Sequence, residues 1–216
     1  MIRPEKIVLY LLLFLGSAPA LEAQVVLKPE ESAVVSRVSR LPGREVFPAV
    51  ALKTNLLYDL TTTFNLGLEF RLSDYFTLDI SGNYNPWTFS NNRKWKHALV
   101  QPELRYWIYE PFNGHFLGMH GVYSRFNVGN IELPFHIWSN LNEYRYDGNA
   151  YGVGFSYGYQ WILSPRWSME ASFGFGYLYL DYDRYVCKTC GDKVGSEYKH
   201  YFGPTKLAVS LIYIIK

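Results

Sequence analysis

The chain is poor in cysteine, since its 216 residues include only Cys187 and Cys190. Two cysteines exclude the multi-disulfide framework of a small secreted domain. A zinc site would need two further ligands at suitable spacing, and a reactive thiol would need a helix N-terminus or a similar environment. We therefore expect a small disulfide between Cys187 and Cys190 that stiffens a loop, and we expect neither a metal nor a cofactor.

The chain also lacks an excess of charge of either sign, with a formal net charge of +2 at pH 7. Nucleic-acid-binding proteins carry clustered basic faces and a high pI, so no nucleic-acid partner is expected. Aromatic residues are abundant instead: they make up 18% of the chain, and tyrosine alone supplies 19 residues. Such an excess suits a protein that lines two membrane–water interfaces with tyrosine and tryptophan.

Long apolar runs are missing, and the longest one near the start covers only residues 7–15. It is too short for a transmembrane helix, which needs about 20 apolar residues. Basic residues precede it and small residues follow it, which is the layout of a secretory signal peptide. We expect residues 1–23 to be this signal peptide, cleaved after Ala20 or Ala23. Residues 24–48, which are polar, would form a periplasmic lead-in.

The chain is rich in segments in which every second residue is apolar, as in residues 63–72. A period of two is the signature of a β-strand with unlike faces. The pattern recurs along most of the chain and predicts eight strands. They cover residues 50–59, 64–72, 76–84, 100–108, 116–126, 151–161, 169–179 and 207–215.

The connections between these strands carry a second signal. Those after the second, fourth and sixth strands are short, whereas those after the third, fifth and seventh are long. Outer-membrane barrels have short periplasmic turns and longer external loops. Pro102 falls within the fourth strand, where it cannot donate to a ladder, so we expect a bulge or a locally unpaired position there.

The polar faces of the predicted strands carry glycines and balanced charges. A soluble barrel such as a lipocalin turns its apolar face inward, but glycine is useful where a small barrel interior leaves little volume. Buried charges persist only when they are paired, so we expect a charge network in the lumen and an apolar face toward lipid. The expected network consists of Lys53, Glu69, Arg71, Asp79, Glu103, Arg105, Glu170 and Lys206.

The sequence thus predicts an all-β fold, an eight-stranded antiparallel up-and-down transmembrane β-barrel over residues 49–216. Arg93, Lys94 and Lys96 fall in an expected external loop, where they could contact lipopolysaccharide phosphates. A merely solvated loop is the alternative. The histidines are scattered and show no spacing that pairs one with an acid, so no catalytic residues are expected. They are His97, His115, His120, His136 and His200.

Several blocks are more specific than the alternation: residues 53–59, 82–89, 95–97, 101–107 and 113–116. Through them the chain resembles an uncharacterised family of small outer-membrane β-barrel proteins from Bacteroidota, classed as a domain of unknown function. The resemblance implies a Gram-negative source and insertion by the barrel-assembly machinery. Some relatives look like neighbours of surface-fimbria components, which points to surface or fimbrial proteins as partners. It supplies no catalytic or binding residues.

We therefore expect a protein of the outer membrane with a structural or surface-interaction role. Its external loops would contact lipopolysaccharide, a host ligand or another surface protein, and its body would contact outer-membrane lipid. A narrow channel or transporter component is the alternative. An outer-membrane lipid-modifying enzyme comes third, and we do not expect an enzyme.

Overall fold

The computed structural model describes residues 50–89, 93–129, 144–186 and 193–215. The predicted signal peptide, the predicted lead-in and the Cys187–Cys190 pair lie outside these residues, and so does His136.

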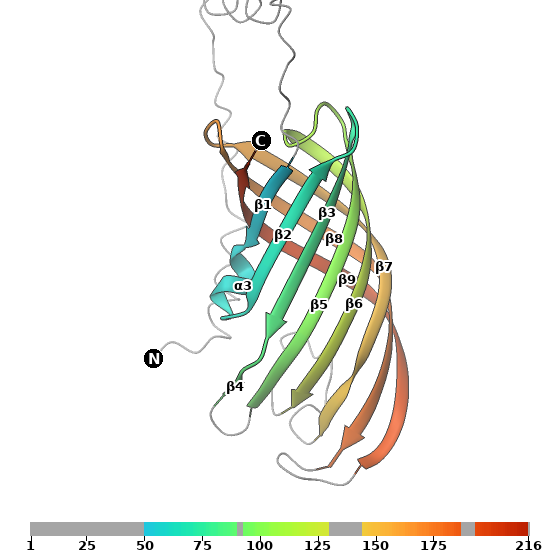
Figure 1. The fold of residues 1–216 in the computed structure, drawn as a ribbon. Helices are drawn as coiled ribbons and strands as arrows, with labels where there is room; N and C mark the ends of the chain where they lie inside the picture. Colours follow the sequence, from blue (N-terminus) through green and yellow to red (C-terminus); the bar gives the residue numbers. More distant parts are fainter. Residues whose placement is uncertain (1–49, 90–92, 130–143, 187–192, 216) are drawn as a thin grey trace, which may run out of the picture. The chain divides into compact units, whose positions relative to one another are not determined.

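The described residues form one antiparallel sheet that returns on itself as a ring (Figure 1). Neighbours follow the order β3-β2-β1-β9-β8-β7-β6-β5-β4, and β3 also pairs with β5. Because β4 has only two residues, the other eight strands make the ring, which confirms the predicted all-β fold of eight antiparallel strands. The strands are β1 (Val50–Asn55), β2 (Phe64–Arg71), β3 (Phe76–Asn85), β4 (Thr88–Phe89), β5 (Arg93–Trp107), β6 (Gly114–Gly129), β7 (Arg145–Ile162), β8 (Trp167–Tyr185) and β9 (Lys193–Ile214).

The two ends of the ring differ in their connections. At one end, which we call the turn end, residues 72–75, 108–113 and 163–166 join successive strands. The first of these turns is closed by the Ser73 side chain, whose oxygen accepts a hydrogen bond from the Phe76 N–H at 3.2 Å. The strand ends that flank the other four connections lie at the opposite end, which we call the loop end (Figure 1).

A short helix, α3 (Leu56–Leu60), follows β1 and corrects the predicted first strand. We expected the alternation to continue through Leu56 and Tyr58, but β1 ends at Asn55. The Asn55 side-chain oxygen accepts a hydrogen bond from the Leu57 N–H at 3.1 Å, which caps the helix and ends the strand. None of the helical segments in the described part of the chain has the length and apolarity to cross a membrane.

Pro102 interrupts the pairing of β5 with β6 without shifting its register. Val100 lies opposite Tyr123 and Glu103 lies opposite His120, so the register is the same on both sides of the proline. The irregularity predicted at Pro102 is therefore a locally unpaired position in the β5–β6 ladder and not a bulge. A true bulge occurs elsewhere, where β9 inserts Thr205 between the partners of Gly174 and Phe175 in β8.

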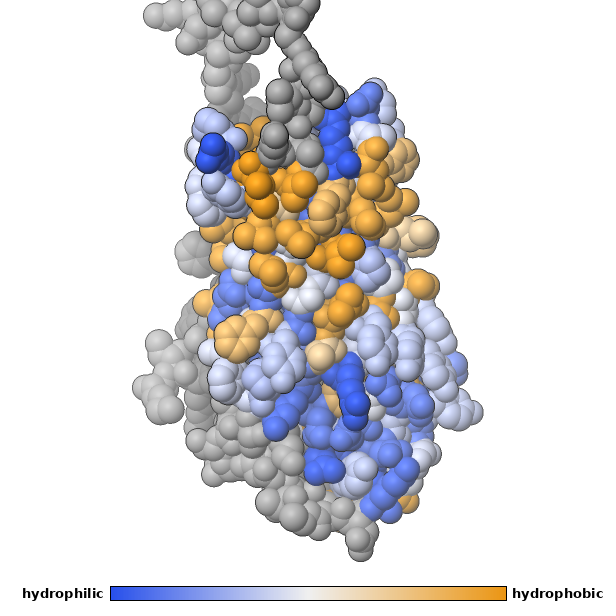
Figure 2. Space-filling model, viewed as in Figure 1, coloured by the Kyte–Doolittle hydropathy of each residue, from blue (hydrophilic) through white to orange (hydrophobic). Residues whose placement is uncertain are grey.

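Outward-facing side chains of the ring are apolar over a continuous band. Along β7 they run from Tyr151 to Trp161, and Phe155 between them is 71% exposed. The small residues that alternate with them, such as Ser156, are buried. Figure 2 shows that apolar side chains gather toward the turn end, whereas hydrophilic side chains cover the half nearer the loop end.

Candidate functional site

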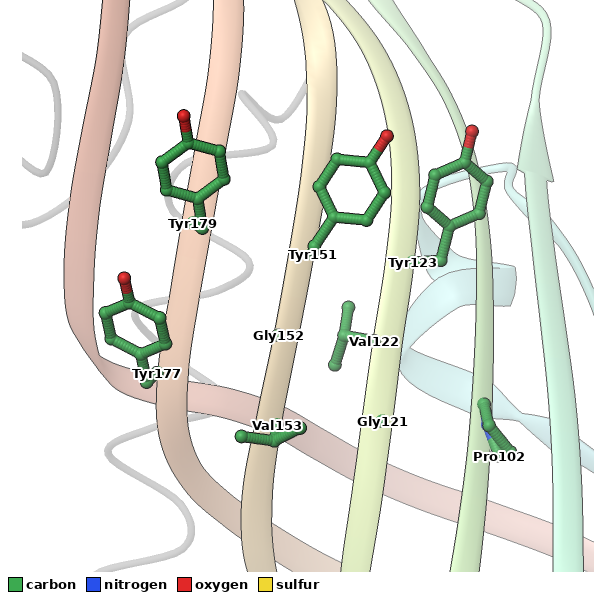
Figure 3. Close-up of a pocket in the computed structure, with 9 residues that line it drawn as sticks. All are labelled: Pro102, Gly121, Val122, Tyr123, Tyr151, Gly152, Val153, Tyr177 and Tyr179. Atoms are coloured by element: carbon green, nitrogen blue, oxygen red, sulfur yellow. The ribbon is translucent and has the colours of Figure 1, made fainter.

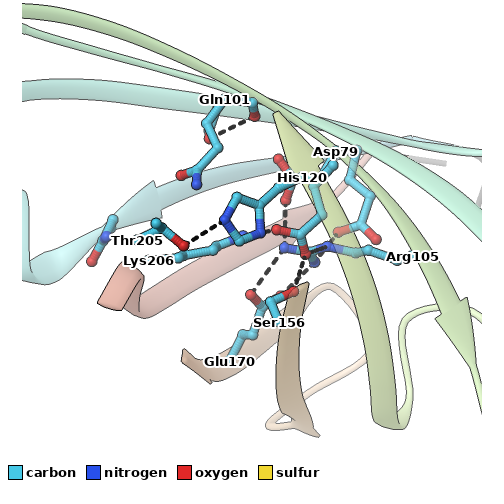
Figure 4. A network of polar contacts seen from close by, with 12 residues as sticks. Asp79, Gln101, Arg105, His120, Ser156, Glu170, Thr205 and Lys206 are labelled. Carbon is cyan, nitrogen blue, oxygen red and sulfur yellow. Dashed lines mark hydrogen bonds and ion pairs between the residues drawn. The ribbon is translucent and has the colours of Figure 1, made fainter. Parts of the chain in front are cut away.

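Seven charged side chains meet in one ion-pair network inside the ring (Figure 4). They come from six strands, because alternation turns one polar side chain after another inward and the ring brings the strands together. All seven were predicted as lumen charges. They are Lys53, Glu69, Asp79, Glu103, Arg105, Glu170 and Lys206.

Arg105 lies at the centre of the network and is 1% exposed. Its Nε is 2.9 Å from Oε1 of Glu103, and its Nη2 is 2.8 Å from Oδ2 of Asp79. Its Nη1 is 3.0 Å from Oε2 of Glu69 and 2.8 Å from Oε2 of Glu170. The planar guanidinium presents five donors in fixed directions, so one residue can bind four carboxylates at once.

Two lysines complete the network. The Nζ of Lys53 lies 3.0 Å from Glu69, 2.9 Å from Asp79 and 2.6 Å from Glu170. Lys206 forms an ion pair with Glu103. The Lys53 contacts join β1 to β2, β3 and β8, and the Lys206 contact joins β9 to β5, which lies across the ring from it.

Arg71 does not take its predicted place beside these residues. It shares a face with Glu69, but it is the last residue of β2 and lies at the turn end. There its Nη2 forms an ion pair with Asp74 at 2.9 Å, and its Nε donates to the Ser73 carbonyl at 3.1 Å. Alternation reports which face a residue occupies and not its depth in the ring, so the sequence listed Arg71 together with the seven residues above.

Further polar side chains lie beside the network, and sequence reasoning did not place them there. The Nε2 of His120 lies 2.9 Å from Oγ1 of Thr205, which the β9 bulge turns inward next to Lys206. Ser156 donates to Glu103 at 3.2 Å (Figure 4). The only sequence signal for the bulge was the neighbouring Gly203-Pro204 pair, since both residues weaken regular strands.

Three aromatic rings fill the interior between the network and the turn end. Trp107, Phe112 and Phe116 are each at most 2% exposed. The ring centroids of Trp107 and Phe116 are 4.9 Å apart, and the Arg105 guanidinium lies 4.4 Å from the Phe116 centroid. Phe112 has a φ of +68°, which is uncommon for a bulky residue, and this conformation accompanies its burial. We call these three residues the aromatic plug.

On the loop-end side of the network the interior holds a cavity of about 320 Å³. Lys53, Asp79 and Arg105 line its inner part, and Leu57 and Tyr58 of α3 line it as well. Oδ1 of Asp79 and Nε2 of Gln101 are buried there without a hydrogen-bond partner among the described residues. The cavity therefore offers an acceptor and a donor to water or to a small polar molecule.

The basic stretch lies in a strand and not in the loop that we predicted. β5 already begins at Arg93, and the backbone of Lys94 pairs with Thr88 of β4. The side chain of Lys96 is exposed. The stretch therefore continues the wall of the ring beyond the apolar band.

The other histidines of the described ranges contact aromatic residues. His115 lies 2.6 Å from the Tyr157 hydroxyl, and His200 lies 2.5 Å from the Tyr177 hydroxyl. The ring centroid of His97 is 6.3 Å from that of Tyr58. Within the described ranges, no group of three or more His, Cys, Asp or Glu residues is arranged to hold a metal ion.

Comparison with known protein families gives a match. A family model described as "Protein of unknown function (DUF3575)" matches residues 32–215. No curated protein and no solved structure matches the chain.

Proposed function

We propose that this chain, which belongs to the DUF3575 family of proteins of unknown function, is an outer-membrane β-barrel protein with a structural or surface-interaction role. The proposal includes export by the signal peptide, insertion by the barrel-assembly machinery and a Gram-negative source such as the Bacteroidota. The turn end would face the periplasm, and the loop end would face the exterior.

The observation that carries the proposal is the inverted polarity of the ring. Glu69 and Arg105 are at most 1% exposed, whereas Phe155 is 71% exposed. A soluble barrel buries its apolar face and solvates its charges, so it would have the opposite arrangement. Lipid around the ring gives the apolar side chains an apolar environment, and closure of the ring pairs the backbone groups that lipid cannot solvate.

Aromatic residues at the two borders of the band support the same proposal. Near the turn end the rings of Trp167 and Tyr213 are 5.0 Å apart, and toward the loop end those of Tyr123 and Tyr151 are 5.3 Å apart. Tyrosine and tryptophan favour membrane–water interfaces because one end of the ring is apolar and the other is polar. The band of β7 from Tyr151 to Trp161 is close to the roughly 9–11 residues that a transmembrane strand needs.

The contents of the interior favour a structural or surface role over transport. The network and the aromatic plug occupy the lumen, and a barrel of eight strands is only wide enough for side chains to fill. β7, β8 and β9 continue past the apolar band toward the loop end, where the surface is hydrophilic (Figures 1 and 2). That extension is the surface on which lipopolysaccharide, a host ligand or a surface protein would bind.

Membrane fractionation and gel migration of the full chain expressed in Gram-negative cells test this proposal. The protein should be recovered in the outer-membrane fraction, and its migration should change on boiling because a closed barrel resists the detergent of the gel. A mature protein recovered as a soluble periplasmic monomer would contradict the proposal.

A narrow channel is the second candidate, and the polar cavity beside the network favours it. Conduction would require ions to pass the aromatic plug, so we expect no steady conductance in planar bilayers. The channel gains support if the wild-type protein conducts and if Glu69→Gln or Arg105→Met changes its ion selectivity. Trp107→Ala is the matched variant for these two substitutions, because it removes side-chain volume from the aromatic plug and leaves every charge of the network in place.

A further inference from the structure

The outward face of the ring carries an apolar groove of about 500 Å³ across β5, β6, β7 and β8 (Figure 3). Its floor includes Pro102, Gly121 and Gly152, and its walls include Tyr123, Tyr151 and Tyr179. This volume falls within the range of small-molecule sites, about 300–1,000 Å³. The groove lies on the opposite side of the sheet from the charge network.

The groove exists because two neighbouring positions lack bulk. Gly121 is an outward-facing position of β6, and Pro102 of β5 lies beside it where the two strands leave their ladder. A Cβ atom on Gly121 would lie 3.7 Å from Cγ of Pro102, which is ordinary van der Waals contact. A larger residue would therefore fit at Gly121 and fill the groove, so neither backbone strain nor crowding accounts for the glycine.

The tyrosines give the groove a direction. Figure 3 shows the hydroxyl groups of Tyr123, Tyr151 and Tyr179 pointing the same way along the strands, away from Gly121 and Val153. That direction leads to the loop end, and the Tyr123 hydroxyl donates to Oδ1 of Asn149 at 3.4 Å. The groove is thus apolar at its floor and polar at one edge, which matches an amphipathic ligand.

Two cations lie just beyond this polar edge. Arg125 follows Tyr123 on the same face of β6, and Lys96 lies on the neighbouring strand, opposite Asn127. Both side chains are exposed, and neither has an ion-pair partner among the described residues, whereas Arg184 pairs with Glu197. Residues diagonal across two strands have Cβ atoms roughly 7–8 Å apart, so both cations can reach one phosphate group.

The acidic residues at this level lie on β7 and β8, and Asp147 of β7 is diagonal to Arg125 across the β6–β7 pair. Asp147 of β7 accepts a hydrogen bond from Asn127 at 2.8 Å, and Asp183 of β8 forms an ion pair with Lys193. Asp181 is an exposed residue of β8. Along this edge β5 and β6 carry Lys96 and Arg125 and no carboxylate among their described residues, so this part of the rim suits an anion.

We propose that this groove binds an acyl chain of the lipid A part of lipopolysaccharide, with a lipid A phosphate on Arg125 and Lys96. The inference rests on the proposed function, because only in an outer-membrane barrel does the loop end lie in the leaflet that contains lipid A. It places the lipid contact in this outward groove and on Arg125, and the sequence had not singled out Arg125.

Native mass spectrometry of the folded full-length protein in detergent micelles, titrated with bisphosphorylated lipid A, tests the inference. The wild-type protein should hold one lipid A molecule, and the Lys96→Ala/Arg125→Ala double variant should bind it at least about tenfold more weakly. Gly121→Leu should lose the bound lipid by filling the groove. Arg166→Ala removes an exposed cation at the turn end, and Gly82→Leu fills an outward glycine outside the groove, so both should bind like the wild type.

Several results would overturn the inference while leaving the barrel proposal intact. They are the lack of a lipid A adduct on heat-modifiable wild-type protein, equal binding by the groove variants and their controls, and equal binding of lipid A stripped of its phosphates. Tighter binding of phosphatidylglycerol than of lipid A would also overturn it. If boiling does not change the gel migration of the wild-type protein, that result contradicts the proposed function itself, before any lipid is added.

Discussion

At the scale of single residues, Arg105 has the largest structural role, since it binds Glu69, Asp79, Glu103 and Glu170 within 3.0 Å. Burying these charges is costly, and the ion pairs offset that cost only while each charge keeps its partners. The network therefore makes the interior sensitive to the loss of any one member.

Replacing Arg105 with Met should destabilise the protein by about 3–5 kcal/mol, because it leaves four buried carboxylates with two lysines. Urea unfolding in detergent micelles, followed by tryptophan fluorescence, measures the change. Combining Arg105→Met with Glu170→Gln should recover part of the loss, since the two residues are in contact. Arg166→Met, at an exposed arginine, is the matched control and should cost less than about 1 kcal/mol. An equal cost for both single variants would show that the network does not stabilise the ring.

Gly176 shows how closely the strands approach on the inner face. A Cβ atom there would lie 2.3 Å from the carbonyl oxygen of Val153 and 2.6 Å from Cα of Gly154. Because both contacts are with backbone, Gly176→Ala should lower the unfolding free energy by about 1–3 kcal/mol. The matched variant is Gly82→Ala on the outer face, where the nearest atom is 3.9 Å away and the change should be neutral or slightly stabilising. Similar unfolding midpoints for the two variants would contradict this packing.

At the scale of elements, α3 depends on Asn55. Besides capping the helix, the Asn55 side chain donates to the Leu207 carbonyl at 3.3 Å and accepts from the Val209 N–H at 3.3 Å. One residue therefore ends β1, starts α3 and holds both against β9.

Asn55→Ala should cost about 0.5–2 kcal/mol in unfolding free energy, the usual range for the loss of a helix cap. It should also make the α3 segment more sensitive to limited proteolysis. Asn55→Asp keeps an acceptor for the Leu57 N–H, so it should retain most of the protection. Equal cleavage rates for the wild type and for Asn55→Ala would rule out the capping role.

Alternation in the sequence predicted the strands well because it records which side of a sheet each residue faces. The same rule predicted the inward charges, seven of which meet in the network. It did not predict α3, because Leu56 and Tyr58 continue the period of two and the cap of Asn55 decides the backbone instead. It also missed Thr205, since a bulge changes the facing of the residues that follow it.

At the scale of the whole molecule, the ring combines a charged interior with an apolar exterior. The closed order of strands lets every long strand pair on two sides over much of the ring, so few backbone groups in the apolar band need water. The aromatic plug could not be predicted from the sequence, because Phe112 belongs to a turn and its inward position depends on a positive φ. Phe116 lies in a segment whose facing the sequence left open.

The central claim is that the apolar band contacts lipid, and spin-label accessibility at Phe155 tests it most directly. In a protein with Cys187 and Cys190 replaced by Ser, nitroxide labels are placed at Phe155→Cys or, as the control, at Asp181→Cys, and the protein is reconstituted into vesicles. The account predicts that oxygen, which partitions into the bilayer, reaches the label at position 155, and that a water-soluble nickel chelate reaches the label at position 181. Equal accessibility of both labels to the nickel chelate would contradict the account.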